Sequence, residues 1–218
     1  VGLEREESVL FNVAVSSPVM ALSVDGMAVL DPVGPRSISL YSINYQQVRI
    51  SLYGVGPEDW TSFNAYRRQR WYGGTPAVEN TPLPGRLITS KVVDLRSSAD
   101  EVVETVIDLS PALHDGLGQV LVAVESIMPA SDRRHDPLLA WVQLTNIGLD
   151  AIADNKELLG WASSLVDGAP LSDVQLQILP AGIAGVTSSN GTAHLAFKPY
   201  KDSPPSVLVA RRGSDLAF

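Results

Sequence analysis

Residues 174–197 read VQLQILPAGIAGVTSSNGTAHLAF, and this stretch decides the fold class. Apolar and polar residues alternate in two runs, whose apolar faces hold Val174, Leu176 and Ile178, then Ala193, Leu195 and Phe197. A period of two residues indicates strands with one buried and one solvated face, as in antiparallel sheets. Asn190-Gly191 between the runs predicts a hairpin, because a type I′ turn needs positive φ at both central residues.

The same period recurs through most of the chain. Apolar residues share one strand face in two further runs, at Val48, Ile50 and Leu52 and at Val120, Val122 and Val124. Turn signals separate the runs, among them the Asp-Gly pairs at 25–26 and 167–168 and the segment 212–215. Short strands with turns at regular spacing predict an all-β fold of immunoglobulin/fibronectin-like antiparallel β-sandwiches.

One segment breaks this pattern and predicts a single helix at about 57–70. Pro57 suits the first helical position, and the acidic residues that follow suit the positive end of the helix dipole. Arg67, Arg68 and Arg70 lie near the other end, where cations are favoured. The residues at 72–85 form either a protease-accessible segment or, as we favour, an ordered surface connection.

The polar segment Met128–Leu138, with two prolines, is the predicted domain boundary. It gives a first domain at 9–128 and a second at 138–212, each near the size at which a sandwich buries a core. A short proline-containing linker acts as a semi-stiff spacer, so we expect the two domains to move relative to each other.

Composition excludes several function classes. The 218 residues carry a net charge of −8, which argues against nucleic acid and anionic membrane as partners. They contain no cysteine, which excludes disulfides, thiol nucleophiles and thiolate metal sites. The chain shows no targeting signal and does not begin with Met, so we expect that it starts inside a longer protein.

No catalytic motif is present, and we predict no catalytic, cofactor-binding or metal-binding residues and no cofactor. The sequence has no P-loop, GxSxG, HExxH, SxxK or strand-linked GxGxxG pattern. His114, His135 and His194 are too scattered to indicate a metal site. Ser110, His114 and Asp115 have the composition of a catalytic triad but crowd one corner, so we interpret them as a turn.

The remaining charged or modifiable candidates have simpler explanations. Asp132 and Asp136 could suggest a calcium loop, but the arginines between them oppose a cation. The arginines at 67–70 form either a small basic patch or, as we favour, a solvated helix end. Asn190-Gly191-Thr192 matches a glycosylation sequon, which the turn itself explains.

Three motifs in the second half of the chain carry a family resemblance: residues 141–149 (WVQLTNIGL), 157–165 (ELLGWASSL) and 167–171 (DGAPL). They are similar to the WVQVTDLGL strand, LLVWVTSL strand and (T/D)GxPV turn of the bacterial alpha-2-macroglobulin family, and most of the chain resembles that family. The end, 209–218, resembles VARxGDDLAFL, whereas 185–197 departs from the family pattern by extra length before Phe197. Trp141 and Trp161 within these strands fit core positions or interdomain anchors, and we favour core. The first domain resembles the preceding macroglobulin (MG) domain through 48–55, 105–113 and 118–124, less specifically.

The resemblance implies two consecutive MG domains of a periplasmic or extracytoplasmic protease trap, whose parent can be anchored to the inner membrane. In that family a protease cuts a bait segment, the molecule rearranges, and a Cys–Gln thioester captures the attacker. Without cysteine, this segment is implied to be non-enzymatic scaffold. Its partners are then the neighbouring MG domains and, through the whole protein, target proteases. The alternatives are an Ig-like surface adhesion or interaction module, and the accessory β-domain of an enzyme.

Overall fold

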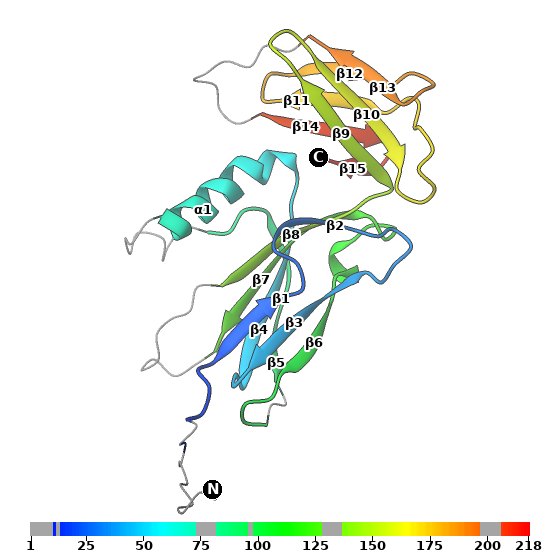
Figure 1. The fold of residues 1–218 in the computed structure, drawn as a ribbon. Helices are drawn as coiled ribbons and strands as arrows, with labels where there is room; N and C mark the ends of the chain where they lie inside the picture. Colours follow the sequence, from blue (N-terminus) through cyan, green and yellow to red (C-terminus); the bar gives the residue numbers. More distant parts are fainter. Residues whose placement is uncertain (1–10, 12–13, 73–81, 96–97, 128–136, 197–205) are drawn as a thin grey trace, which may run out of the picture.

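The computed structural model of the protein describes residues 11, 14–72, 82–95, 98–127, 137–196 and 206–218. They form two β-sandwiches stacked end to end, with the helix α1 beside the junction (Figure 1). The elements in chain order are β1 (Val19–Leu22), β2 (Gly26–Leu30), β3 (Ser37–Ile43), β4 (Gln47–Gly54), η1 (Pro57–Asp59), α1 (Trp60–Tyr72), β5 (Arg86–Asp94), β6 (Val103–Asp108), η3 (Ser110–Ala112), β7 (Gly118–Ser126), β8 (Leu138–Leu144), β9 (Ile147–Ala153), β10 (Leu158–Ser164), β11 (Gln175–Leu179), β12 (Ile183–Val186), β13 (Thr192–Leu195), β14 (Val207–Arg212) and β15 (Asp215–Ala217).

The first sandwich packs the sheet β1-β3-β6 against the sheet β2-β8-β7-β4-β5. Neighbouring strands are antiparallel except β2 and β8, which run parallel. The predicted inner faces are confirmed, because the alternating residues of β4 and β7 are at most 8% exposed and lie in one apolar cluster: Val48, Ile50, Leu52, Val120, Val122 and Val124. The all-β prediction is therefore confirmed in this half of the chain.

The helix predicted at 57–70 is confirmed and runs to Tyr72 after a short 3₁₀ turn at 57–59. Pro57 opens that turn, and the Asp59 carboxylate accepts the Gly56 N–H at 3.0 Å, which satisfies a donor at the start. Phe63 and Tyr66 are buried, and Phe63 packs against Leu121 and Trp141 of the first sandwich. The Arg67 guanidinium lies 5.7 Å from the centre of the Phe63 ring.

The predicted boundary at Met128–Leu138 is wrong, and so is the start of the second domain at 138. β8 pairs with β7, with Val124 opposite Leu138, and also with β2, so it belongs to the first sandwich. The segment between β7 and β8, of which 128–136 lie outside the described residues, therefore joins two neighbouring strands of one sheet. The chain instead enters the second sandwich at Thr145 and Asn146, between β8 and β9.

The second sandwich packs the sheet β13-β10-β9 against the sheet β12-β11-β14-β15. Its predicted buried residues are confirmed, with Val174, Leu176, Ile178, Ala193 and Leu195 all at most 6% exposed. Phe197 lies outside the described residues. The two sheets and their antiparallel pairing confirm the sandwich class for this half as well.

The hairpin predicted at Asn190-Gly191 is wrong, although a turn is present there. β12 and β13, on either side of the turn, belong to different sheets. Gly191 has φ of +79°, whereas Asn190 is not among the residues with positive φ, so the turn is not type I′. The turn docks on β10 instead, because Ala162 donates its N–H to the Gly191 carbonyl at 2.8 Å.

Candidate functional site: the junction between the two sandwiches

The outer face of β7 and β8 is covered rather than exposed. Gln119 lies opposite Gln143, and Leu121 lies opposite Trp141. All four are at most 7% exposed, although their alternate neighbours already fill the inner core. A sheet buried on both faces needs a second layer, which here comes from α1 and from the C-terminal hairpin β14–β15.

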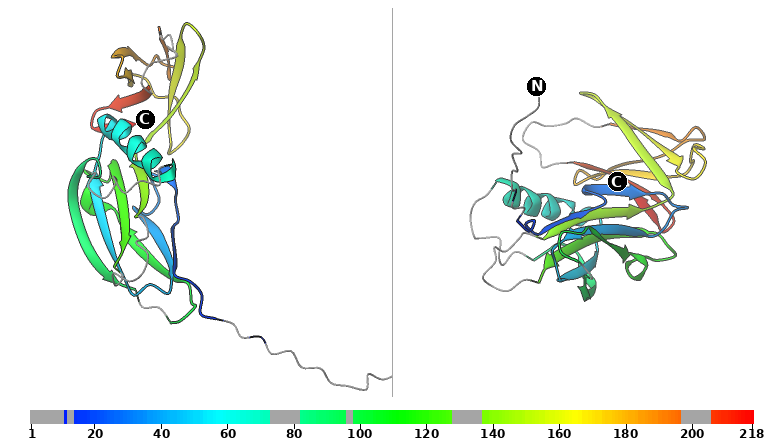
Figure 2. Two further views of the ribbon diagram at one scale, coloured as in Figure 1. Left: turned by 90° about the vertical axis from the view of Figure 1, so that its left-hand side faces the viewer. Right: turned by 60° about the horizontal axis from the view of Figure 1, so that its bottom comes forward.

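Four aromatic rings from three parts of the chain meet on this face. Trp141 lies 5.2 Å from Phe63 and 5.3 Å from Phe218, and Trp60 lies 5.9 Å from Trp141 and from Phe218, measured between ring centres. These pairs meet edge to face, the arrangement that aromatic quadrupoles favour. The left view of Figure 2 shows the C-terminus beside α1, in agreement with the contact between Trp60 and Phe218.

Two glutamine side chains bind the backbone of the C-terminal segment. The Gln143 amide accepts the Phe218 N–H at 3.1 Å and donates to the Phe218 carbonyl at 2.8 Å. The Gln119 amide donates to the Leu216 carbonyl at 2.9 Å and accepts the Trp141 indole N–H at 3.1 Å. Three of these bonds link the two sandwiches, and the bond from Trp141 holds Gln119 in place. The interface therefore combines apolar packing with hydrogen bonds that fix the position of the C-terminal segment.

Asp215 ties the crossover between the sandwiches to β15. Its carboxylate accepts the Thr145 hydroxyl at 2.6 Å and the Asn146 N–H at 2.9 Å. Thr145 is fully buried, and its hydroxyl oxygen also accepts the Ile147 N–H at 3.0 Å. The residues that connect the two sandwiches are thus held by hydrogen bonds at Thr145 and Asn146, and not by a proline-containing spacer at 128–138.

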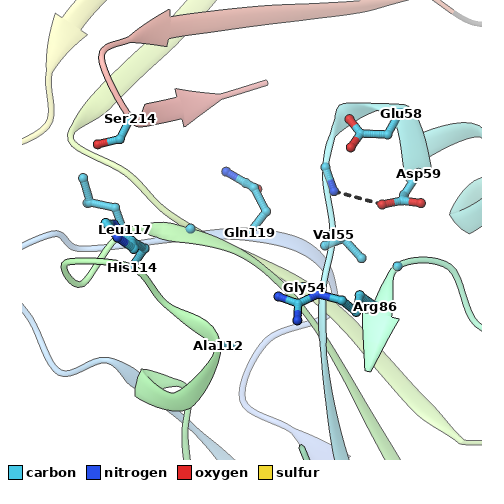
Figure 3. A pocket seen from close by; sticks show the side chains of 13 residues that line it. Gly54, Val55, Glu58, Asp59, Arg86, Ala112, His114, Leu117, Gln119 and Ser214 are labelled. Carbon is cyan, nitrogen blue, oxygen red and sulfur yellow. Dashed lines mark hydrogen bonds between the residues drawn. The ribbon is translucent and has the colours of Figure 1, made fainter. Parts of the chain in front are cut away.

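An open pocket of about 490 Å³ lies at the edge of this junction (Figure 3). Glu58 and Asp59 of η1 form one wall, His114 and Leu117 form the opposite wall, and Ser214 reaches in from the turn between β14 and β15. Arg86 adds a cation to the lining. The walls carry both signs of charge without a pronounced excess, so the pocket indicates no particular ligand.

The triad-like residues form a turn, as interpreted from the sequence. Ser110 begins η3 and donates its N–H to Asp108, whereas His114 contacts Asp115 at 3.3 Å on the exposed surface. His194 lies 3.4 Å from Glu157, and His135, Asp132 and Asp136 lie outside the described residues. Within the described ranges, no group of three or more metal-ligating side chains occurs. Among the described candidates, His114 and Asp115 meet on the exposed surface, whereas Ser110 bonds to Asp108 instead.

The two tryptophans singled out in the sequence differ in their burial, and Asn190 belongs to a turn. Trp141 is fully buried and is an anchor of the junction. Trp161 is only partly buried and alternates with the buried Leu158, Gly160 and Ala162, so its assignment to the core is wrong. Asn190 uses its side-chain oxygen to accept the Thr192 N–H and hydroxyl, which matches a role in the turn.

The junction glutamines were missed from the sequence, although a signal for them exists. β7 and β8 are largely apolar runs interrupted by one glutamine each, on the same face as Leu121 and Trp141. A polar residue amid such a run must find a hydrogen-bond partner if it is buried. That requirement indicates a docked second layer, which the period of two alone does not reveal.

No helix among the described residues is long and apolar enough to cross a membrane.

No protein-family model matches the chain. Among curated proteins, circularly permutated Ras protein 2 of Dictyostelium discoideum is 28% identical over 164 residues. The match covers 66% of this chain, which spans 4% of that protein's length.

Solved structures of bacterial alpha-2-macroglobulins share the fold. The native Escherichia coli protein spanning domains NIE-MG1 has a TM-score of 0.63 at 15% identity, covering 91% of this chain and 94% of that one. A longer piece, MG0-NIE-MG1, gives 0.60 at 17% identity, covering 91% of this chain and 62% of that one. The trypsin-activated E. coli protein gives 0.61 at 17% identity, and this chain covers 14% of it.

Proposed function

We propose that this chain is a two-domain scaffold segment of a bacterial alpha-2-macroglobulin that takes part in protease inhibition through its parent protein. The observation that carries the proposal is that both sandwiches align together on a single two-domain structure, with over nine-tenths of each chain covered. Because that structure spans domains NIE-MG1, we assign the first sandwich to the NIE position and the second to MG1. The first unit then differs from the MG domain implied by its sequence.

The sequence motif that suggested the family supports the same proposal. Residues 141–149 begin in β8, cross at Thr145 and Asn146, and end in β9. They include Trp141 and Gln143, which make the aromatic and amide contacts of the junction. A motif that spans the junction depends on both domains being present, so it argues for the pair rather than for an isolated Ig-like module.

The role that follows for this segment is mechanical. It has no cysteine and therefore holds no thioester. Its described surface offers a packed junction and no assembled catalytic group, which suits a part that holds other domains in place. In this proposal its partners are the neighbouring domains of the parent chain, the parent acts on proteases outside the cytoplasm, and this segment is not an enzyme.

The test compares the full-length parent with this chain alone at equal molar concentration. Each is incubated with trypsin, and the remaining activity is measured on casein and on a small peptide substrate. The parent is expected to lower casein cleavage, because a trapped protease is shielded from bulky substrates, while this chain leaves both activities unchanged. The proposal fails if the parent leaves casein cleavage unchanged, or if this chain alone inhibits stoichiometrically.

A further inference from the structure

The strand β15 has one paired edge and one edge that meets side chains instead of a strand. It lies at the end of the sheet order β12-β11-β14-β15, with Ala217 opposite Ala210 and Leu216 opposite Arg211. An unpaired strand edge exposes a row of N–H and C=O groups. Here that row includes the Leu216 carbonyl and, directly after the strand, the N–H and carbonyl of Phe218, and these three groups have glutamine partners.

We infer that Gln119 and Gln143 together take the place of a neighbouring strand along the free edge of β15 and so dock the second sandwich on the first. A side-chain amide carries the same donor and acceptor as a peptide group, so it can replace the missing neighbour. Gln143 supplies both to Phe218, and Gln119 supplies a donor to Leu216. The two glutamines are cross-strand partners on β7 and β8, which places their amides side by side.

Each amide makes a further contact with a side chain of the first sandwich. The second donor direction of Gln143 meets the Met27 sulfur at 3.2 Å, and the Gln119 oxygen is held by the Trp141 indole N–H. Gln143 is 1% and Gln119 is 7% exposed. A buried polar group that loses its partner costs free energy. Moving the sandwiches apart therefore costs free energy at each of these atoms unless water replaces the partner.

The contacts of Gln119 and Gln143 indicate that these residues serve the second sandwich. In the first sandwich alone, apolar side chains at 119 and 143 would extend the surface of Leu121 and Trp141 without any unsatisfied amide. The glutamines therefore serve the second sandwich, by fixing where the backbone of β15 lies. Asp215 binds the crossover residues from the first position of the same strand, so β15 is fixed at both ends. This inference stands on the contacts of this chain and does not depend on the proposed parent protein.

Hydrogen exchange of the complete chain, followed residue by residue, tests the inference with two variants. Gln143→Leu keeps an apolar contact and removes both bonds to Phe218. Gln119→Glu keeps an acceptor for Trp141 and removes the donor to Leu216. Each is expected to accelerate amide exchange in 215–218 by at least about tenfold, because a buried partner is lost. Amides of β4, in the core of the first sandwich, keep their protection.

The matched control is Gln175→Leu, which changes an exposed glutamine on β11, a strand that pairs with β14 rather than with β15. It is expected to leave exchange in 215–218 unchanged. Unchanged exchange at 215–218 in both junction variants would overturn the inference. Equal acceleration in β4 and in 215–218 would overturn it as well, because the glutamines would then support the first sandwich internally rather than dock the second.

Discussion

The Thr145 hydroxyl donates to the Asp215 carboxylate at 2.6 Å, across 70 residues of sequence. Thr145 is the first residue after β8, and Asp215 is the first residue of β15. The bond therefore joins the place where the chain enters the second sandwich to the hairpin by which that sandwich returns to the first. Both residues are buried, so the bond is shielded from water.

Replacement of Thr145 by Val tests the weight of this bond. The variant keeps the shape of the side chain but removes the donor to Asp215 and the acceptor for the Ile147 N–H. We expect the free energy of unfolding to fall by about 2–3 kcal/mol, since a buried charge-assisted bond is lost and a buried N–H is orphaned. Thr145→Ser keeps the hydroxyl and serves as the control. Equal denaturation midpoints for the Thr145→Val variant and the wild-type protein would contradict this prediction.

The turn at Gly191 offers a matched pair of glycine substitutions. A Cβ at Gly191 would lie 2.6 Å from the Ala162 carbonyl oxygen, in backbone with φ of +79°. Gly168 has a similar φ of +74°, but a Cβ there would meet no atom within 4 Å. Gly168→Ala is expected to cost about 1–2 kcal/mol from the backbone alone, and Gly191→Ala clearly more. Denaturant unfolding that ranks the two variants in the opposite order would refute the proposed close approach.

Stability is expected to fall in acid because hydrogen bonds lower the pKa of several surface aspartates. Asn44 and then the Ser16 N–H stabilise the charged form of Asp100, and the N–H groups of Lys156 and Glu157 do so for Asp154. A pKa below the ordinary value of 3.8 means that the unfolded chain binds the proton more tightly. This contribution is complete above that value and is lost as the pH falls through the lowered pKa.

Thermal unfolding of wild-type protein and of Asp154→Asn, at pH 7 and at pH 3, measures this effect. The variant removes one titrating group and keeps an oxygen that can accept both N–H groups. Its midpoint is therefore expected to drop less between the two pH values than that of the wild type. An equal drop in the two proteins would show that Asp154 contributes nothing to acid sensitivity.

The period of two in the sequence was enough to predict the buried strand faces, because a strand buried on one side alternates apolar and polar residues. Val48, Ile50 and Leu52 in β4 are buried as predicted. The helix could also be predicted, because Pro57 and the acidic residues after it are typical of the first turn of a helix. Both features depend on near neighbours in the chain.

The domain boundary and the junction could not be predicted in the same way, because they depend on contacts between distant residues. A polar segment between two apolar strands has the same composition whether it links two domains or two strands of one sheet, as it does between β7 and β8. The pairing of Gln143 with Phe218, 75 residues away, leaves no local pattern. The hairpin prediction at Asn190-Gly191 was wrong for a related reason, because the turn packs against Ala162 of β10.

If the two sandwiches form one rigid body, a spin label on each lies at one fixed distance from the other, and that distance can be measured. The chain has no cysteine, so the double substitution Val106→Cys and Ile152→Cys allows specific labelling of one exposed site in each sandwich. Double electron–electron resonance on this protein is predicted to give a single narrow distance distribution. A broad distribution, or several separate distances, would show instead that the two sandwiches move independently.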